Sequence, residues 1–533
     1  MRLLPPKAAK LGIVHPVLFA LYPVLFLYSS NFGQTSFFVA LWPMLLFPAV
    51  SMLLWLILMA LRCRAEKAAL LTSVVVILFC SFGHAHALLY QPLLSYERDV
   101  AGVNSPLLLV KTVLFIAISV VWLGLILAAA WMVRGKPAWL GGVTRFLNVA
   151  SLALLALPLI TLLYDLGSGQ LGRDVETSNT EPMAQRRALD YKPDIYYIIL
   201  DGYAREDVLK TFYGYDNSSF TTHLARLGFQ VPPKTRSNYS WTFLSLASSL
   251  NMEHVNWFAK EIGEDSRNRQ LPYRMIRDNE VARYLRKRGY MSVHLTSTWG
   301  ATLANPYADI EISCGTGIFR IEFYRVLANS TWLRVLESSV SSDLAMCHLF
   351  NFQMLGEVAK KRFPKFVFAH FIPPHHPYLF DRDGNILRSA TVSNQFEFRK
   401  HLWRDKAKYI SQLEFVNQKV KEAVDAILAN SERPPIIIIQ SDHGPSLEQA
   451  PARIRKGVRL ANFLAAYLPG APTLLPDDIT PVNLFPTILN YYFDDQLSTS
   501  PQLYYVSPYT RPYKLRLFDR FAEAEALLQA PGS

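Results

Sequence analysis

Long apolar segments dominate the first third of the chain. Each is about as long as a helix that crosses a bilayer core of about 30 Å. One such segment alone can equally be a buried core helix, but several in succession with almost no internal charge indicate a membrane domain. We therefore predict a transmembrane domain of five helices over residues 1–168. Its apolar segments run over residues 11–29, 36–61, 68–90, 106–133 and 146–166.

The pattern changes after this region. Residues 169–193 are rich in Gly, Ser, Thr, Asn and charge, which is typical of a linker. In the remaining block, 194–533, short apolar runs alternate with helical patterns, which predicts an α/β domain with a mostly parallel central sheet. The runs are continuously apolar, so we expect strands covered on both faces. They lie at residues 194–200, 291–295, 365–371 and 435–440.

Basic residues in the short loops indicate the orientation in the membrane. Lys and Arg occur in every second loop, and the loops between them carry no excess of positive charge. By the positive-inside rule the N-terminus is then cytoplasmic, and an odd number of spans places residues after about 168 outside. The basic loops contain Arg2, Lys7 and Lys10, then Arg62, Arg64 and Lys67, then Arg134 and Lys136.

The composition fits a membrane domain joined to a globular one, because 51% of the residues are hydrophobic and only 18% are charged. The net charge of +12 does not indicate a nucleic-acid partner. Residues 1–168 hold 11 Lys or Arg against 4 Asp or Glu, so the basic excess is densest in membrane loops. Four cysteines exclude a disulfide framework. Outside the membrane part, Cys314 and Cys347 either pair in an oxidising compartment or remain buried thiols.

Acidic residues and a histidine follow two predicted strands. Asp201 comes directly after the first strand, and Asp442 and His443 come after the last. Sites in parallel sheets lie at the carboxyl ends of strands, so these side chains can converge on one divalent cation, Zn²⁺ or Mn²⁺. Taken singly, Asp201 can be a helix cap and Asp442 part of an Asx-turn. Their joint placement favours the metal site.

Thr242 stands at the start of a predicted helix, in the segment RSNYSWTFLSLASSLNM over residues 236–252. A helix N-terminus attracts anionic groups, and a hydroxyl beside a metal can lose its proton and attack phosphorus. Thr242 is therefore a candidate catalytic nucleophile and metal ligand. The alternative is that Thr242, or Ser240, only caps the helix.

Three histidines and a basic run complete the candidate residues. His370, His375 and His376 lie within FAHFIPPHHPYLF and can bind a phosphate oxygen or protonate a leaving group. One of them, most simply His370 within its strand, can instead serve only in packing. The run Arg453, Arg455, Lys456 and Arg459 follows the Asp-His pair and either binds an anionic group or forms a solvated face.

These motifs, in this order, resemble the alkaline phosphatase and sulfatase superfamily, and most closely its membrane-bound phosphoethanolamine transferases and lipoteichoic acid synthases. The resemblance covers about residues 194–490 and implies an alkaline-phosphatase-like α/β domain behind the five-helix anchor. It implies one catalytic metal held by Asp201, Thr242, Asp442 and His443. It also implies substrate binding by His376 and, less directly, by His375.

This chain differs from related families in two motifs, and each difference bears on the expected reaction. Sulfatases carry a Cys/Ser-x-Pro-x-Arg motif, whereas this chain has Ser240-Trp241-Thr242-Phe243 at that place. The chain also has no histidine after His443, unlike two-metal phosphatases and some phosphoethanolamine transferases. The first departure argues against a sulfatase, and the second leaves the donor head group open between phosphoethanolamine and phosphoglycerol.

The expected function is therefore a phosphotransferase of the inner membrane with a periplasmic or extracellular catalytic domain. It would move a phospholipid head group onto a glycan or lipid acceptor through phospho-Thr242. One alternative is a membrane-anchored phosphodiesterase or other hydrolase of the same superfamily, with water as the acceptor. A second alternative is a catalytically inactive scaffold that binds no metal.

Overall fold

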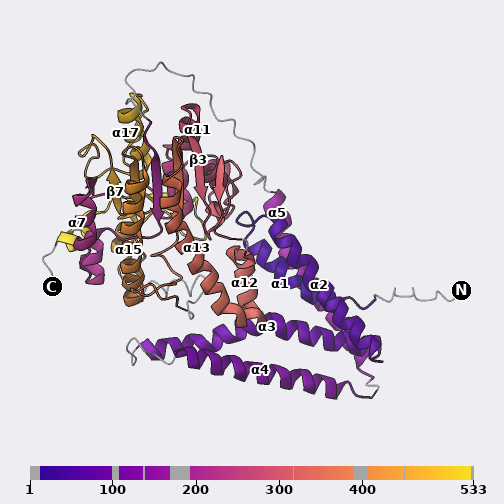
Figure 1. Ribbon diagram of the computed structural model, residues 1–533. Coiled ribbons are helices and arrows are strands. Elements are labelled where there is room, and N and C mark those ends of the chain that lie inside the picture. Colours follow the sequence, from indigo (N-terminus) through magenta and orange to yellow (C-terminus); the bar gives the residue numbers. More distant parts are fainter. Residues whose placement is uncertain are drawn as a thin grey trace. The chain divides into compact units, whose positions relative to one another are not determined.

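A computed structural model describes residues 12–98, 107–135, 138–167, 192–315, 317–387, 405–448 and 450–529. The chain forms two compact units (Figure 1). The helical unit contains the N-terminal region and the later segment Arg325–Leu336, and the α/β unit contains the rest of the chain.

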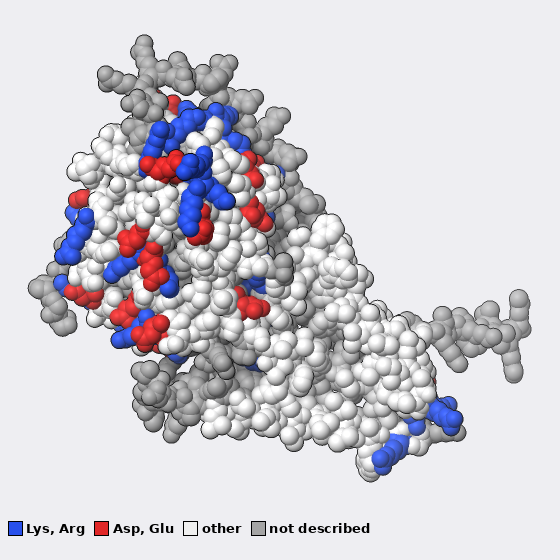
Figure 2. Space-filling model, in the orientation of Figure 1, with Lys and Arg blue, Asp and Glu red and all other residues white. Residues whose placement is uncertain are grey.

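In the described N-terminal region, the helical unit contains five helices with long apolar stretches. Four contain stretches long and apolar enough to cross a membrane, and the first helix is a shorter one of 16 residues. Large apolar side chains exposed on the protein are concentrated between Phe26 and Tyr164. Figure 2 shows the corresponding surface almost without charge, as expected of a surface that faces lipid. The helices are α1 His15–Ser30, α2 Phe37–Ala60, α3 Ala65–Arg98, α4 Leu107–Met132 and α5 Leu140–Gly167.

Two polar side chains of this unit, Asn148 and His15, connect neighbouring helices. The Asn148 amide oxygen on α5 accepts a hydrogen bond from the His15 backbone N–H at 3.1 Å. The His15 Nδ1 lies 2.6 Å from the Ser73 hydroxyl on α3. In a membrane such groups need partners within the protein, so these contacts fix α1 among its neighbours.

The segment Arg325–Leu336 packs against α3 and α4 although it is distant from them in the sequence. The Trp332 indole N–H donates to the Ser119 hydroxyl on α4 at 3.4 Å, and its ring lies 5.8 Å from that of Phe115. Gly83 on α3 faces the backbone of Asn329 so closely that a Cβ at Gly83 would clash with it. The segment belongs to α12 (Glu322–Ser330) and the 3-10 helix η4 (Trp332–Leu336).

The α/β unit is organised around a seven-stranded sheet in the order β2-β7-β6-β1-β5-β3-β4. Strands β6, β1, β5, β3 and β4 run parallel to one another, and β7 and β2 join the β6 edge in antiparallel fashion. The strands are β1 Ile195–Leu200, β2 Phe229–Gln230, β3 Met291–Leu295, β4 Ile310–Ile312, β5 Lys365–Phe371, β6 Ile436–Gln440 and β7 Leu464–Tyr467.

Helices cover both faces of this sheet, which is why its central strands are continuously apolar. Along β1, Ile195, Tyr197 and Ile199 point into one hydrophobic core, and the residues between them point into the other. The expected α/β class and mostly parallel sheet are thus confirmed. The longer helices are α7 Ser218–Arg226, α8 Thr242–Asn251, α10 Gln270–Arg277, α11 Glu280–Lys287, α13 Glu337–Ala359, α15 Lys406–Asn430, α16 Ala452–Leu460, α17 Pro481–Phe493 and α18 Ala522–Gln529.

A disulfide joins Cys314, after β4, to Cys347 on α13. Of the two possibilities that the sequence left open, the structure adopts the paired one. The bridge closes a loop whose ends are 33 positions apart. This loop contains the whole segment Arg325–Leu336, so the disulfide joins the stretches of the α/β unit that precede and follow this segment.

Candidate active site

Three neighbouring strands bring the predicted residues together. Asp201 follows β1, Asp442 and His443 follow β6, and His370 is near the end of β5. Because β6, β1 and β5 are adjacent and parallel, their carboxyl ends meet at one edge of the sheet. The turn after β1 is made by Gly202, with φ of +64°, whose N–H donates to the Asp442 carboxylate at 3.0 Å.

Asp201, Asp442 and His443 form a compact buried cluster. Each offers one ligand atom, and these atoms lie within 4.8 Å of one another. One carboxylate oxygen of Asp201 and one of Asp442 are buried without a hydrogen-bond partner. Buried carboxylate oxygens without donors are costly unless a cation satisfies them. Two such oxygens beside an imidazole fit a divalent cation such as Zn²⁺ or Mn²⁺.

The tautomer of His443 suits this role. Its Nδ1 lies 3.0 Å from the Gly444 carbonyl oxygen, which can only accept, so Nδ1 carries the proton. Nε2 therefore presents a lone pair toward the cluster, 3.1 Å from the second carboxylate oxygen of Asp442. Orientation of a histidine ligand by a backbone carbonyl is common in metal sites.

The electrostatics of the cluster follow from its burial. Burial raises the pKa of Asp442 to about 7, and the nearby Asp201 carboxylate adds to this rise. Burial also raises the pKa of Asp201, although His375 and Arg459 oppose the shift. The pKa of His443 lies well below its ordinary range, chiefly through burial and secondly through the Arg459 charge. A neutral imidazole next to carboxylates that resist ionisation is an arrangement that a cation stabilises.

Thr242 is the first residue of α8 and lies at this cluster. Its Oγ1 is 3.1 Å from the His443 Nε2, and its side chain is only partly buried. The helix is held here by Ser245, whose hydroxyl donates to the Asp442 carbonyl oxygen at 2.7 Å. Ser245 was not predicted as a site residue, because one turn into the helix it is only part of an amphipathic pattern in the sequence.

His370 is completely buried, and its Nε2 lies 3.7 Å from the Asp201 carboxylate. Its Nδ1 is 2.9 Å from the Thr302 hydroxyl, which in turn lies 2.6 Å from the Ser297 hydroxyl. Burial lowers the pKa of His370 to about 4. The structure therefore places His370 against the cluster of Asp201, Asp442 and His443, on its β5 side. Thr302, which positions it, ends the short 3-10 helix η2 (Gly300–Thr302), which has no sequence signal.

His375 and His376 lie in the loop after β5. The His375 backbone N–H donates to the Asp201 carbonyl oxygen at 3.1 Å, which holds this loop against the cluster. Its side-chain Nδ1 lies 2.6 Å from the His376 carbonyl oxygen, and the two rings are 4.0 Å apart. Both histidines therefore belong to the same neighbourhood as the four predicted metal ligands. Their part in substrate binding stays a prediction.

The basic run after β6 separates into two kinds of residue. Arg453 forms an exposed ion pair with Glu523, and Lys456 is exposed. Arg459 instead turns inward, with its Nη2 donating to the His443 Nε2 at 2.7 Å. The solvated-face interpretation thus fits the first part of the run, and Arg459 belongs to the site.

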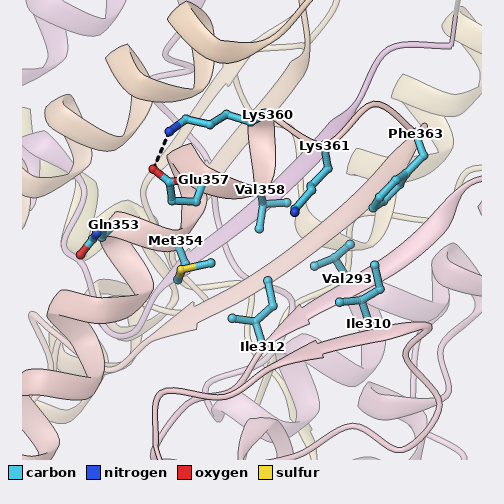
Figure 3. A pocket seen from close by; sticks show the side chains of 10 residues that line it. All are labelled: Val293, Ile310, Ile312, Gln353, Met354, Glu357, Val358, Lys360, Lys361 and Phe363. Atoms are coloured by element: carbon cyan, nitrogen blue, oxygen red, sulfur yellow. Dashed lines mark hydrogen bonds and ion pairs between the residues drawn. The ribbon is translucent and has the colours of Figure 1, made fainter.

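A separate hollow of about 740 Å³ lies by the edge strand β4 (Figure 3). It is lined largely by apolar side chains of β3, β4 and the end of α13. Lys360, Lys361 and Phe363 line it just before β5 begins, at the end of the strand opposite to Asp201. It is therefore not part of the candidate active site.

Comparison with known proteins gives a family match within the α/β unit. Residues 245–492 match the family model described as Sulfatase. The matched region contains Asp442, His443 and the three histidines, and it begins just after Thr242. A comparison with curated protein sequences finds no match.

Several solved structures of phosphoethanolamine transferases are similar to the chain. The C-terminal periplasmic domain of EptC from Escherichia coli, in complex with Zn, is 12% identical with a TM-score of 0.42, covering 65% of this chain and 99% of that domain. Lipooligosaccharide phosphoethanolamine transferase A from Neisseria meningitidis, an integral membrane protein, is 15% identical with a TM-score of 0.39, covering 91% of this chain and 85% of that one. The periplasmic domain of EptC from Campylobacter jejuni is 11% identical with a TM-score of 0.36, covering 58% and 97%.

Proposed function

We propose that this protein is a membrane-anchored, metal-dependent phosphotransferase. It moves a phospholipid head group, phosphoethanolamine or phosphoglycerol, onto a glycan or lipid acceptor outside the cytoplasm. The observation that carries the proposal is the position of Thr242. Its hydroxyl is partly exposed at the start of α8 and lies 3.1 Å from His443 in the buried cluster with Asp201 and Asp442.

Asp201, Asp442, His443 and Thr242 would hold the cation. When bound, a divalent cation lowers the pKa of a coordinated hydroxyl and neutralises charge on phosphoryl oxygens. A sulfatase-family domain with Thr242 in place of a Cys/Ser-x-Pro-x-Arg motif favours a phosphate ester over a sulfate ester as the substrate.

The chemistry then proceeds in two displacements. In the first, the bond between the Thr242 oxygen and phosphorus forms while the bond to the diacylglycerol oxygen breaks, and His375 or His376 gives that oxygen a proton. In the second, an acceptor hydroxyl attacks phosphorus and returns a proton to the same histidine, and the Thr242–phosphorus bond breaks. Thr242 enters and leaves as an alkoxide, so the cycle balances.

The proposal places the α/β unit outside the cytoplasm of a bacterial cell, with the N-terminus inside. The alternation of basic loops supports this orientation, provided that α1 enters the membrane with the other four helices. A lipid donor then reaches the site by diffusion in the outer leaflet of the same bilayer. The acceptor is a glycan or lipid of the cell envelope, and nucleic acid has no part in the reaction.

Intact-mass analysis tests the proposal. The purified full chain is incubated in detergent with Zn²⁺ or Mn²⁺ and vesicles of phosphatidylethanolamine and phosphatidylglycerol, with Thr242→Ala as the matched variant. We expect a covalent mass increment on the wild type that is absent from the variant, and its size identifies the head group.

Adding an extract of envelope glycans and lipids separates a transferase from a hydrolase. A transferase attaches the head group to a second molecule, whereas a hydrolase releases it into water with no modified acceptor. A wild type that binds metal but shows neither an increment nor turnover of either lipid would refute the proposed donor class. A wild type that binds no metal would favour a scaffold.

A further inference from the structure

Arg459 is the one member of its basic run that reaches the candidate site. It lies in the last turn of α16, a helix whose end packs directly on the chain after His443. The Gly444 N–H donates to the Arg459 carbonyl oxygen at 2.8 Å. A Cβ on Gly444 would clash with the carbonyl oxygen of Val458, so glycine is required for this approach. The position of Arg459 is therefore built into the fold.

Two nitrogens of the guanidinium are held by backbone carbonyls. Nε donates to the Ser240 oxygen at 3.0 Å, and Nη1 donates to the Gly444 oxygen at 3.1 Å. The guanidinium carbon also lies 5.3 Å from the centre of the Trp241 ring. Ser240 and Trp241 immediately precede Thr242, and Gly444 immediately follows His443. The side chain thus bridges the segment with the nucleophile and the segment with the imidazole.

The Arg459 Nη2 and the Thr242 hydroxyl both lie within hydrogen-bond distance of the His443 Nε2. The His443 Nε2 has one lone pair, which faces Arg459 Nη2 at 2.7 Å and the Thr242 Oγ1 at 3.1 Å. A cation held by His443 would use the same lone pair. The Arg459 Nη2 and the Thr242 hydroxyl would then no longer have the His443 Nε2 as their hydrogen-bond acceptor.

We propose that Arg459 is a phosphate-binding residue whose Nη2 donates to a non-bridging oxygen of the phosphoryl group that is transferred to Thr242. This inference rests on the proposed function. A planar guanidinium that two carbonyls already hold in place loses little conformational entropy when it binds an oxyanion. Charge-assisted hydrogen bonds of this kind are also strong. It also supplies positive charge against the two buried carboxylates, which otherwise repel a phosphate.

The test compares Arg459→Met with Lys456→Met, an exposed residue of the same helix that the site does not use. Orthovanadate binding to the Zn²⁺- or Mn²⁺-loaded full chain is measured by calorimetry, together with metal affinity without vanadate. We expect vanadate affinity to fall at least 10-fold in Arg459→Met alone, and metal affinity to be kept or increased. Formation of the covalent adduct slows by about 100- to 1000-fold, as for loss of one oxyanion donor.

Arg459→Lys keeps the charge without the planar fork, so it separates function from folding. We expect it to melt like the wild type and to show an intermediate vanadate affinity. Equal vanadate affinity in Arg459→Met and Lys456→Met would overturn the inference, and so would an equal loss of metal and vanadate affinity. Because vanadate binding needs no lipid, a wild type that forms no adduct counts against the proposed function alone.

Discussion

The hydroxyl oxygen of Thr242 lies 3.1 Å from Nε2 of His443, although 201 positions separate the two residues in the sequence. The contact exists because α8 begins beside the carboxyl end of β6, where Ser245 fastens its first turn to the Asp442 carbonyl. A nucleophile candidate at the start of a helix and a metal-ligand candidate just after the end of a strand are thereby brought together.

We expect that removing one of the buried carboxylates raises the stability of the metal-free protein and weakens metal binding. Asp201→Asn removes one of two acidic groups whose pKa values are raised by burial, so the metal-free protein should melt about 2–4 °C higher. The same change should weaken Zn²⁺ or Mn²⁺ binding by about 100-fold or more. Differential scanning fluorimetry with and without EDTA checks both expectations. An unchanged metal-dependent stabilisation in the variant would remove Asp201 from the ligand set.

The disulfide predicts a difference between oxidising and reducing conditions. Cys314 and Cys347 close a loop of 33 positions, and a bridge of this size contributes about 3–4 kcal/mol in the chain-entropy model. Cys347→Ser should therefore lower the melting temperature and make it insensitive to dithiothreitol. Cys63→Ser, in the helical unit, is the matched control because Cys63 is a free cysteine. If both variants respond to dithiothreitol like the wild type, the bridge does not form.

We expect that position 83 in the helical unit accepts only glycine, because the backbone of Asn329 lies against it. A methyl group there meets the Asn329 backbone, whereas one on Gly124 of α4 meets nothing within 4 Å. Gly83→Ala should destabilise the unit by about 1–3 kcal/mol through overpacking, and Gly124→Ala should be neutral or slightly stabilising. Thermal unfolding in detergent, with limited proteolysis around Arg325–Leu336, measures the difference. Equal behaviour of the two variants would mean that the segment does not pack on α3.

Acid sensitivity should arise partly from His294 on β3. Burial lowers the pKa of its imidazole from 6.5 to about 4, so the folded protein holds it neutral while the unfolded chain binds a proton more readily. The stability that this histidine contributes is therefore present above pH 6.5 and is lost as the pH falls towards 4. His294→Gln can still donate to the Thr302 carbonyl oxygen, which the His294 Nε2 meets at 3.0 Å.

The difference in unfolding free energy between pH 7 and pH 5 should shrink by about 1–2 kcal/mol in His294→Gln. The same substitution at the half-buried His223 of α7 serves as the control. Urea unfolding of the metal-free full chain at both pH values provides the comparison. A pH dependence identical to that of the wild type would exclude His294 as a source of acid sensitivity.

Local sequence was most informative where one pattern occupies a whole element. The runs at β1, β3, β5 and β6 are apolar without interruption because both faces of those strands are covered, and each was predicted within a residue of its bounds. The long apolar helices of the N-terminal region were predicted for the same kind of reason. Strands β2, β4 and β7 have two to four residues, too few for a period to show, so they were missed.

Some residues of the candidate site could likewise be predicted from local sequence, and others could not. Asp201, Asp442 and His443 were predicted because each follows a recognisable strand, and parallel strands end at one edge of a sheet. Arg459, Ser245 and Thr302 lie in helices or loops where many equivalent polar residues occur. Only the packing of α16 and α8 against the end of β6, and of the 3-10 helix Gly300–Thr302 against β5, selects them.

The sequence by itself determined the two-part organisation of this protein, the class of its larger domain and the residue types available for its chemistry, because hydrophobic periodicity and strand-end motifs are local properties of the chain. The tertiary structure decided which polar groups meet. It turned Arg459 toward His443 and left Arg453 and Lys456 of the same helix exposed, and it placed Arg325–Leu336 in the helical unit. Such choices depend on contacts between residues far apart in the sequence, whose geometry no local pattern encodes.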